Sequence, residues 1–172
     1  MKRTIICIFA VAMLASSCGQ GSDGKSGQQD TTTEVSPASI PGIDKVEVTD
    51  TINLQANDDM RFNNDLFKVK KGKKITLNLK NIGSQAGVPM SHNVVVLAKG
   101  TDIASFADVA GKAKSELYVP SSLTASIVAH TKPVIAGKSE SIEFTLTKPG
   151  VYDFICSFPG HWGTMQGKIV AE

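Results

Sequence analysis

The chain has 172 residues, of which 41% are hydrophobic and 20% charged, an ordinary balance for one globular domain with a sizeable core. Its formal net charge is only +2 at pH 7, and Lys2 and Arg3 supply that excess from a segment that we expect to be removed. The mature chain is then close to neutral, which excludes an electrostatic case for nucleic acid or an anionic membrane surface as a partner.

Residues 1–17 have the composition of an export signal. Lys2 and Arg3 form a positive start, and an apolar run follows from Ile5 to Leu14. That run is too short to span a bilayer as a helix, which needs about 20 residues. Small residues then lead directly to Cys18, as in a bacterial lipobox. We predict a lipoprotein signal over 1–17 and a lipid on Cys18; an ordinary signal peptide with Cys18 as a bystander is the alternative.

Residues 18–43 are rich in Gly, Ser, Gln, Asp and Thr, and their few apolar residues show no period. This composition predicts a flexible linker, which would let an anchored domain stand off a membrane. With Cys7 in the signal and Cys18 lipidated, Cys156 is the one cysteine left in the domain predicted over residues 44–172. No disulfide can form within that domain, so Cys156 is an inert buried thiol, a nucleophile or a metal ligand.

From residue 44 onward, short segments alternate between apolar and polar residues or are wholly apolar, and turn residues separate them. Such period-2 patterning predicts an all-β protein, and we expect an antiparallel β-sandwich. The predicted strands cover residues 46–54, 67–70, 75–80, 94–97, 142–146, 151–156 and 167–170.

The stretch from Asp102 to Lys114 has a different period. Its apolar residues recur at helical spacing, at Ile103, Phe106, Ala107 and Ala110. Asp102 is a suitable N-cap residue. We therefore predict a short helix within a long crossover between two strands.

Three residues that can bind a soft metal lie within ten positions on the loop that follows strand 151–156. They are Cys156, His161 and Met165, and His92 lies upstream at the start of strand 94–97. Two His and one Cys with a weak axial Met are the ligands of blue-copper sites. Because Cu(I) prefers thiolate and thioether while Cu(II) accepts imidazole, a rigidly held mixed set lets copper change oxidation state with little rearrangement.

Each of these residues has a simpler explanation when it is taken alone. A lone Cys beside a strand is usually buried and inert, a His after Pro-Gly is usually a solvated turn residue, and a Met is usually core. Two of the chain's three His and the single mature Cys nevertheless fall into this one pattern. The remaining His130 has no partner at metal-ligand spacing, so we assign it to the surface or to packing.

The loop residues Phe154 to His161, followed by Met165-Gln166-Gly167, resemble the copper loop of azurins and auracyanins. The spacings of five from Cys to His and four from His to Met are those of the azurin-type loop, which is longer than that of plastocyanins. The resemblance extends over residues 48–172, with further similar segments at 54–63, 90–93 and 127–132. It implies a cupredoxin-like Greek-key β-sandwich with one type 1 copper ion.

Carried over residue by residue, the resemblance implies that His92, Cys156 and His161 are equatorial ligands and that Met165 is the axial ligand. The backbone carbonyl of Ser91 would lie on the opposite axial side, at a position where azurins have Gly. Azurins also carry a disulfide near the N-terminus that this chain lacks, and auracyanins are the better match there.

The resemblance also implies roles for residues around the ligands. Asn93 would tie the two ligand loops together by hydrogen bonding near Ser157, and the N–H groups of Asn93 and Phe158 would point at the Cys156 sulfur. The apolar surface around the edge of His161 would be the docking site for redox partners. Its members would be Met60, Met90, Phe158, Pro159 and His161 itself.

The resemblance implies electron transfer by a Cu(I)/Cu(II) site between exported or membrane-associated redox proteins, such as cytochromes or respiratory complexes. The protein would be lipid-anchored to a bacterial membrane on its periplasmic side or at the cell surface. We expect no enzymatic activity, no small-molecule substrate and no nucleic acid. The main alternative is a copper-binding or copper-trafficking lipoprotein. A catalytic cupredoxin would need further His ligands, and a Cys-nucleophile enzyme would have no use for Met165.

Overall fold

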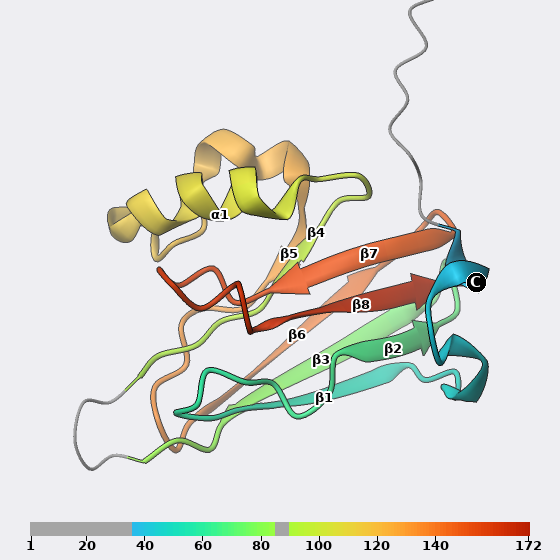
Figure 1. Cartoon of the computed structure of the whole chain (residues 1–172), viewed down its shortest axis with the longest axis horizontal. Helices are drawn as coiled ribbons and strands as arrows, with labels where there is room; N and C mark the ends of the chain where they lie inside the picture. Colours follow the sequence, from blue (N-terminus) through green and yellow to red (C-terminus); the bar gives the residue numbers. More distant parts are fainter. Residues whose placement is uncertain (1–35, 85–89) are drawn as a thin grey trace, which may run out of the picture. The chain divides into compact units, whose positions relative to one another are not determined.

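The structure is a computed structural model, and it describes residues 36–84 and 90–172. The predicted signal, Cys18 and most of the predicted linker lie outside the described residues. Strands dominate the described part, and Figure 1 shows their arrangement. The strands are β1 (Thr51–Ala56), β2 (Leu66–Val69), β3 (Lys74–Asn81), β4 (Val95–Leu97), β5 (Ile127–His130), β6 (Ser139–Thr145), β7 (Gly150–Ile155) and β8 (Gln166–Ala171).

The strands form two sheets, in the orders β1-β3-β6 and β2-β8-β7-β4-β5. This confirms the predicted β-sandwich, but the expectation of an antiparallel sandwich is wrong for two of its strand pairs. β1 pairs with β3 in parallel, and β2 pairs with β8 in parallel. Parallel neighbours need a connection longer than a hairpin turn. Here β2 lies between β1 and β3 in the chain but joins the other sheet, which accounts for the first parallel pair.

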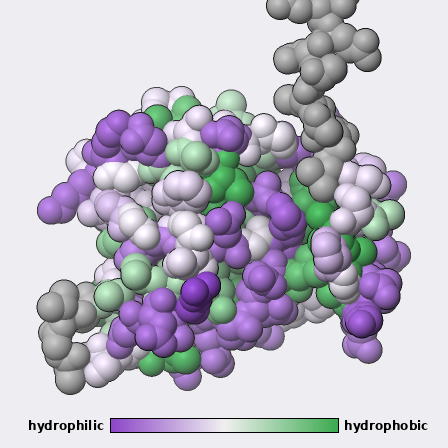
Figure 2. All heavy atoms as spheres, viewed as in Figure 1, coloured by the Kyte–Doolittle hydropathy of each residue, from purple (hydrophilic) through white to green (hydrophobic). Residues whose placement is uncertain are grey.

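Successive side chains along a strand point to opposite faces of the sheet, so every second side chain points into the sandwich. In β1 and β3 the inward residues are buried and most of the outward residues are exposed. The fully buried ring of Phe154 on β7 lies 5.7 Å from the ring of Phe62 and 6.0 Å from that of Phe67, measured between centroids. Hydrophilic residues cover much of the face seen in Figure 2, as expected when apolar side chains point inward.

The predicted helix is present as α1 (Ile103–Lys112), in the crossover between β4 and β5. The Asp102 side chain caps its first turn by accepting a hydrogen bond of 2.8 Å from the Ser105 N–H. Phe106, Ala107 and Ala110 are buried against Val95, Leu97 and Ile155 in a second cluster. Short 3-10 helices follow α1 at Lys114–Glu116 (η3) and Ser121–Ser126 (η4).

Some ordered turns lie before residue 44, the position at which the sequence pattern predicts the start of the domain. Short 3-10 turns occur at Pro37–Ser39 (η1) and Ile43–Lys45 (η2), and Ile40 between them is buried. Figure 1 shows these turns at the end of the sandwich opposite the loop that joins β7 and β8. No helix within residues 36–84 and 90–172 is long and apolar enough to cross a membrane.

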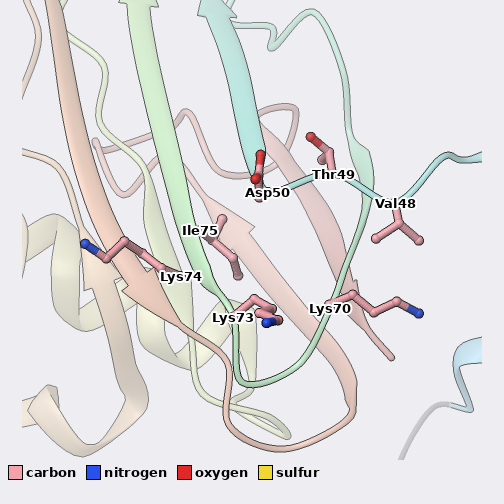
Figure 3. A pocket seen from close by; sticks show the side chains of 7 residues that line it. All are labelled: Val48, Thr49, Asp50, Lys70, Lys73, Lys74 and Ile75. Atoms are coloured by element: carbon pink, nitrogen blue, oxygen red, sulfur yellow. The ribbon is translucent and has the colours of Figure 1, made fainter.

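The same end of the sandwich holds a hollow of about 660 Å³ beside the turn between β2 and β3. Figure 3 shows Lys70 and Lys74 extending away from one another at its rim. Each is paired, Lys70 with Glu172 at 2.8 Å and Lys74 with Glu143 at 3.0 Å. None of the predicted site residues lines this hollow.

Candidate metal centre

The loop between β7 and β8 brings three of the candidate ligands together. Cys156 directly follows β7, and its N–H donates to the Met165 carbonyl at 2.9 Å, which closes the loop. The His161 N–H donates to the Phe158 carbonyl at 3.1 Å, and the Met165 N–H donates to the His161 carbonyl at 2.9 Å. These turns fold the loop back on itself and bury Cys156, His161 and Met165.

His92 reaches the same place from a separate segment that precedes β4. It forms an isolated bridge with Val134, in which the His92 N–H donates to the Val134 carbonyl at 3.1 Å. The Val134 N–H donates back to the His92 carbonyl at 2.7 Å. The backbone on both sides of the imidazole is therefore fixed.

The thiol and the two imidazoles converge. One potential ligand atom each from His92, Cys156 and His161 lies within 4.8 Å of the other two. The Cys156 sulfur is 3.5 Å from Nδ1 of His161, and the two imidazole centroids are 5.0 Å apart. His92, Cys156 and Met165 are 0% exposed and His161 is 9% exposed, so His161 alone of the four retains contact with solvent.

The His92 imidazole indicates that these residues suit a metal ion. Both of its ring nitrogens are buried, and neither has a hydrogen-bond partner among the described residues. A buried polar atom without a partner costs free energy, so such an atom calls for an explanation. A soft or borderline cation bound between one thiolate and two imidazoles would supply the missing interaction, and copper prefers this donor set.

Burial controls the ionisation of these groups in the copper-free protein. It raises the pKa of the Cys156 thiol to about 11, although the N–H groups of Asn93 and Phe158 act in the opposite direction. Burial, and then the neighbouring His161, lower the pKa of His92 to about 4. Burial also lowers the pKa of His161. At neutral pH the thiol is therefore protonated and the imidazoles are uncharged.

Comparisons with protein families and with individual proteins both relate this domain to copper-binding proteins. The family model for copper binding proteins of the plastocyanin/azurin family matches residues 48–172. An azurin of Alcaligenes faecalis is 35% identical over 122 residues, which cover 69% of this chain and 94% of that azurin. The chain belongs to the plastocyanin/azurin family.

Further relatives of this plastocyanin/azurin family member include a membrane protein and an auracyanin. Outer membrane protein H.8 of Neisseria gonorrhoeae is 38% identical over 120 residues, covering 67% of this chain and 64% of that protein. The crystal structure of dithionite-reduced auracyanin from Roseiflexus castenholzii superposes with a TM-score of 0.65 at 29% identity, covering 73% of this chain and 99% of the auracyanin. The family confirms the cupredoxin fold, copper as the cofactor and the coarse function of a blue-copper electron carrier.

In this family member, Asn93 and Ser157 join the two ligand segments. The Asn93 amide donates to the Ser157 hydroxyl at 2.8 Å, and the Ser157 N–H donates to the Asn93 side-chain oxygen at 2.9 Å. The Ser157 hydroxyl in turn donates to the Tyr118 carbonyl at 2.6 Å. Sequence reasoning missed Tyr118, which follows η3 with a positive φ of 63°. A non-glycine residue with positive φ is uncommon, and here that backbone presents its carbonyl to the ligand loop.

The residues predicted for partner docking lie around this end of the domain. The ring of Phe158 is 5.7 Å from the His161 ring and 4.4 Å from the Tyr118 ring, between centroids. Met60 is connected to the ligand loop because the Thr164 hydroxyl donates to its carbonyl at 2.9 Å. Met60, Met90 and Phe158 are half-buried and Pro159 is exposed. His130 is exposed, as expected for a residue outside the site.

Proposed function

We propose that His92, Cys156, His161 and Met165 bind one copper ion, with the Ser91 carbonyl as a weak further contact, and that the protein shuttles electrons between redox proteins. The observation that carries this proposal is the convergence of one thiol and two imidazoles within 4.8 Å inside the sandwich. Copper would supply the one-electron chemistry by alternating between Cu(I) and Cu(II). Met165, which is fully buried beside Cys156 in the main core cluster, suits the axial position.

The residues of the chain would keep the ligands fixed during that change. Hydrogen bonds within the loop between β7 and β8 hold its shape. The bridge of His92 to Val134 fixes the other ligand segment, and the Asn93–Ser157 pair joins the two ligand segments to each other. A ligand set that cannot relax towards the geometry preferred by either oxidation state keeps rearrangement small. The N–H groups of Asn93 and Phe158 directed at the Cys156 sulfur would stabilise its thiolate form.

Electrons would enter and leave through His161. It is the candidate ligand with residual exposure, and Met60, Met90, Phe158 and Pro159 would form an apolar docking patch around it. We infer that exported or membrane-associated redox proteins, such as cytochromes or respiratory complexes, dock there. A small, weakly bonded interface suits a carrier that must dissociate quickly.

We further propose that residues 1–17 are a lipoprotein signal and that a lipid on Cys18, followed by a flexible linker to about residue 43, holds the domain at a bacterial membrane. Similarity to a protein named outer membrane protein H.8 supports a membrane location. The first described residues lie at the end of the sandwich opposite the loop between β7 and β8, which carries His161, so an anchor joined there would leave the docking patch accessible (Figure 1).

Electron transfer fits the site better than copper trafficking. A protein that passes copper to a partner needs ligands that the partner can reach. Here His92, Cys156 and Met165 are fully buried, and both ligand segments are fixed by hydrogen bonds. Such burial favours copper that stays bound while electrons pass.

The test is the visible spectrum of the purified domain after addition of Cu(II). An intense thiolate-to-copper band should develop and saturate at one equivalent. Cys156→Ser should abolish the band. Met165→Leu should retain both copper and colour while the reduction potential rises, because losing the thioether disfavours Cu(II) more than Cu(I). Absence of the band in the wild-type domain, or its persistence in Cys156→Ser, would show that the ligand assignment is wrong.

A further inference from the structure

Two buried polar residues, Asn81 and Thr131, belong neither to the candidate ligands nor to the Asn93–Ser157 pair. Four of the buried polar residues are the two His ligands and the Asn93–Ser157 pair, which leaves Asn81 and Thr131. Both of these bond to the segment that carries His92. The buried polar residues of the described chain are Asn81, His92, Asn93, Thr131, Ser157 and His161.

Asn81 is the last residue of β3, and its side chain is 0% exposed. Its amide nitrogen donates to the carbonyls of Met90 at 2.8 Å and Val134 at 2.9 Å. Its side-chain oxygen accepts a hydrogen bond of 2.9 Å from the Gly83 N–H. Both amide donors are therefore used, and the carboxamide joins three separate parts of the backbone.

Both carbonyls that the Asn81 side chain binds are close to His92, one in space and one in sequence. The Val134 carbonyl accepts from Asn81 and also from the His92 N–H, while Met90 lies two positions before His92. Thr131 acts on the other side, where its hydroxyl accepts from the Val94 N–H at 3.0 Å and its own N–H donates to the Val94 carbonyl at 2.9 Å. The segment 90–94 is thus held from both of its ends.

We propose that Asn81 is a positioning residue of the copper centre, whose amide joins the His92 segment to β3 so that the imidazole is in place before copper binds. The inference rests on the proposed role of His92 as a ligand. Both nitrogens of that imidazole lack partners in the described chain. A freely moving segment would turn such a ring towards water, whereas Asn81 keeps it inside. Residues that orient a metal ligand commonly alter metal affinity 10–100-fold when they are changed.

The test compares Asn81→Asp with Asn78→Asp. The aspartate at 81 retains the shape and an acceptor for the Gly83 N–H, but a carboxyl group donates at most one hydrogen bond, whether or not it is protonated. Asn78 is the matched control because it lies on the outward face of the same strand, where its amide donates to Asn53. If Asn81→Asp does not fold, Asn81→Ser, which is uncharged and also has a single donor, replaces it with the same expected result.

Three properties are measured. Copper affinity comes from competition with a chelator, site geometry from the charge-transfer band, and local order from hydrogen exchange of the His92 and Val134 amides in the copper-free protein. We expect Asn81→Asp to bind copper about 10–100-fold more weakly, to shift the band, and to exchange these two amides faster than the rest of the core. Asn78→Asp should match the wild type in all three.

If Asn81→Asp lowers the melting temperature but leaves the band, the affinity and the two amides as in the wild type, Asn81 is merely structural and the proposal is overturned. A wild-type domain that gives no charge-transfer band would instead overturn the proposed ligand set, and this inference with it. The two failures are therefore distinguished by the wild-type spectrum.

Discussion

At the scale of single residues, Cys156 is subject to two opposing effects. It is 0% exposed, and burial raises the pKa of its thiol to about 11. A metal ligand must instead be the thiolate, because the protonated sulfur is a poor donor. Two backbone N–H groups, those of Asn93 and Phe158, favour the thiolate but do not outweigh burial. The copper-free protein therefore holds a proton that copper must displace.

This displacement predicts a pH dependence for copper binding. His92, with its pKa lowered to about 4, is already unprotonated at pH 7, whereas the Cys156 thiol is protonated. Binding should release about one proton, and apparent affinity should rise about tenfold per pH unit between pH 6 and 9, because proton competition weakens as pH rises. Calorimetric titration in two buffers of different ionisation enthalpy measures the release. Release of no proton would mean that the thiolate forms without copper.

At the scale of elements, β8 closely approaches β7 and Asp65, the residue before β2. Gly167 lies opposite Phe154 in the antiparallel pair of β7 and β8. A Cβ atom at this position would overlap the Phe154 ring and the Asp65 carbonyl. The absence of a side chain therefore lets the aromatic ring lie across β8, directly after the loop that carries His161 and Met165.

Gly167→Ala should destabilise the copper-free domain by about 1–3 kcal/mol, because neither the buried ring nor the backbone carbonyl can move away freely. Chemical denaturation followed by circular dichroism measures this free energy of unfolding. Gly111→Ala in α1 is the control, since its Cβ would meet only Pro159, at an ordinary 3.9 Å. That change should be neutral or stabilising by up to about 1 kcal/mol. Equal stability of the two variants would contradict the packing argument.

At the scale of the whole molecule, the proposed docking and the proposed membrane attachment involve opposite ends of the described domain. The loop between β7 and β8, which carries His161, lies at one end, and the turns of residues 37–45 lie at the other (Figure 1). This arrangement separates the proposed docking patch from the proposed attachment. Each end can be tested without disturbing the other.

The docking patch predicts that a charge near His161 slows electron exchange. In Met60→Glu, two copies meeting through this patch would repel one another, so the electron self-exchange rate should fall at least about tenfold while the reduction potential changes little. Nuclear magnetic resonance line broadening in mixtures of reduced and oxidised protein measures that rate. Val48→Glu places the same charge on an exposed residue at the opposite end, and it should leave the rate unchanged. Equal slowing by both variants would argue against a localised patch.

The proposed anchor predicts that Cys18 alone determines membrane retention. Cys18→Ala should shift the protein to the soluble exported fraction or stall its processing, since the lipid can no longer be attached. Cys7→Ala, within the predicted signal, should leave retention as in the wild type. Fractionation of cells followed by mass measurement of the processed chain distinguishes these outcomes. A processed Cys18→Ala form that stays with the membrane would refute lipid anchoring.

The local pattern of the sequence by itself determined the helix, the candidate ligands and the described strands other than β5, because residues 127–132 were expected to form a strand only from the family resemblance. Alternating residues in β1 and β3 and the cap at Asp102 act over a few neighbouring positions, so they are readable without the fold. The close spacing of Cys156, His161 and Met165 on one loop is equally local. His92 was identifiable because the chain contains few His and because its short motif resembles a family segment.

Only the tertiary structure decided how distant segments meet. β1 pairs with β3, and β2 pairs with β8, although no turn connects the members of either pair directly. The alternation of residues along one strand does not indicate which other strand pairs with it. Asn81 looks like an ordinary polar residue at a strand end, and Tyr118 like a loop residue, until folding places them against Met90 and Ser157. Their roles depend on hydrogen bonds to the backbone of remote segments, and every residue type offers the same carbonyl. For that reason no side-chain pattern in the sequence marks those partners.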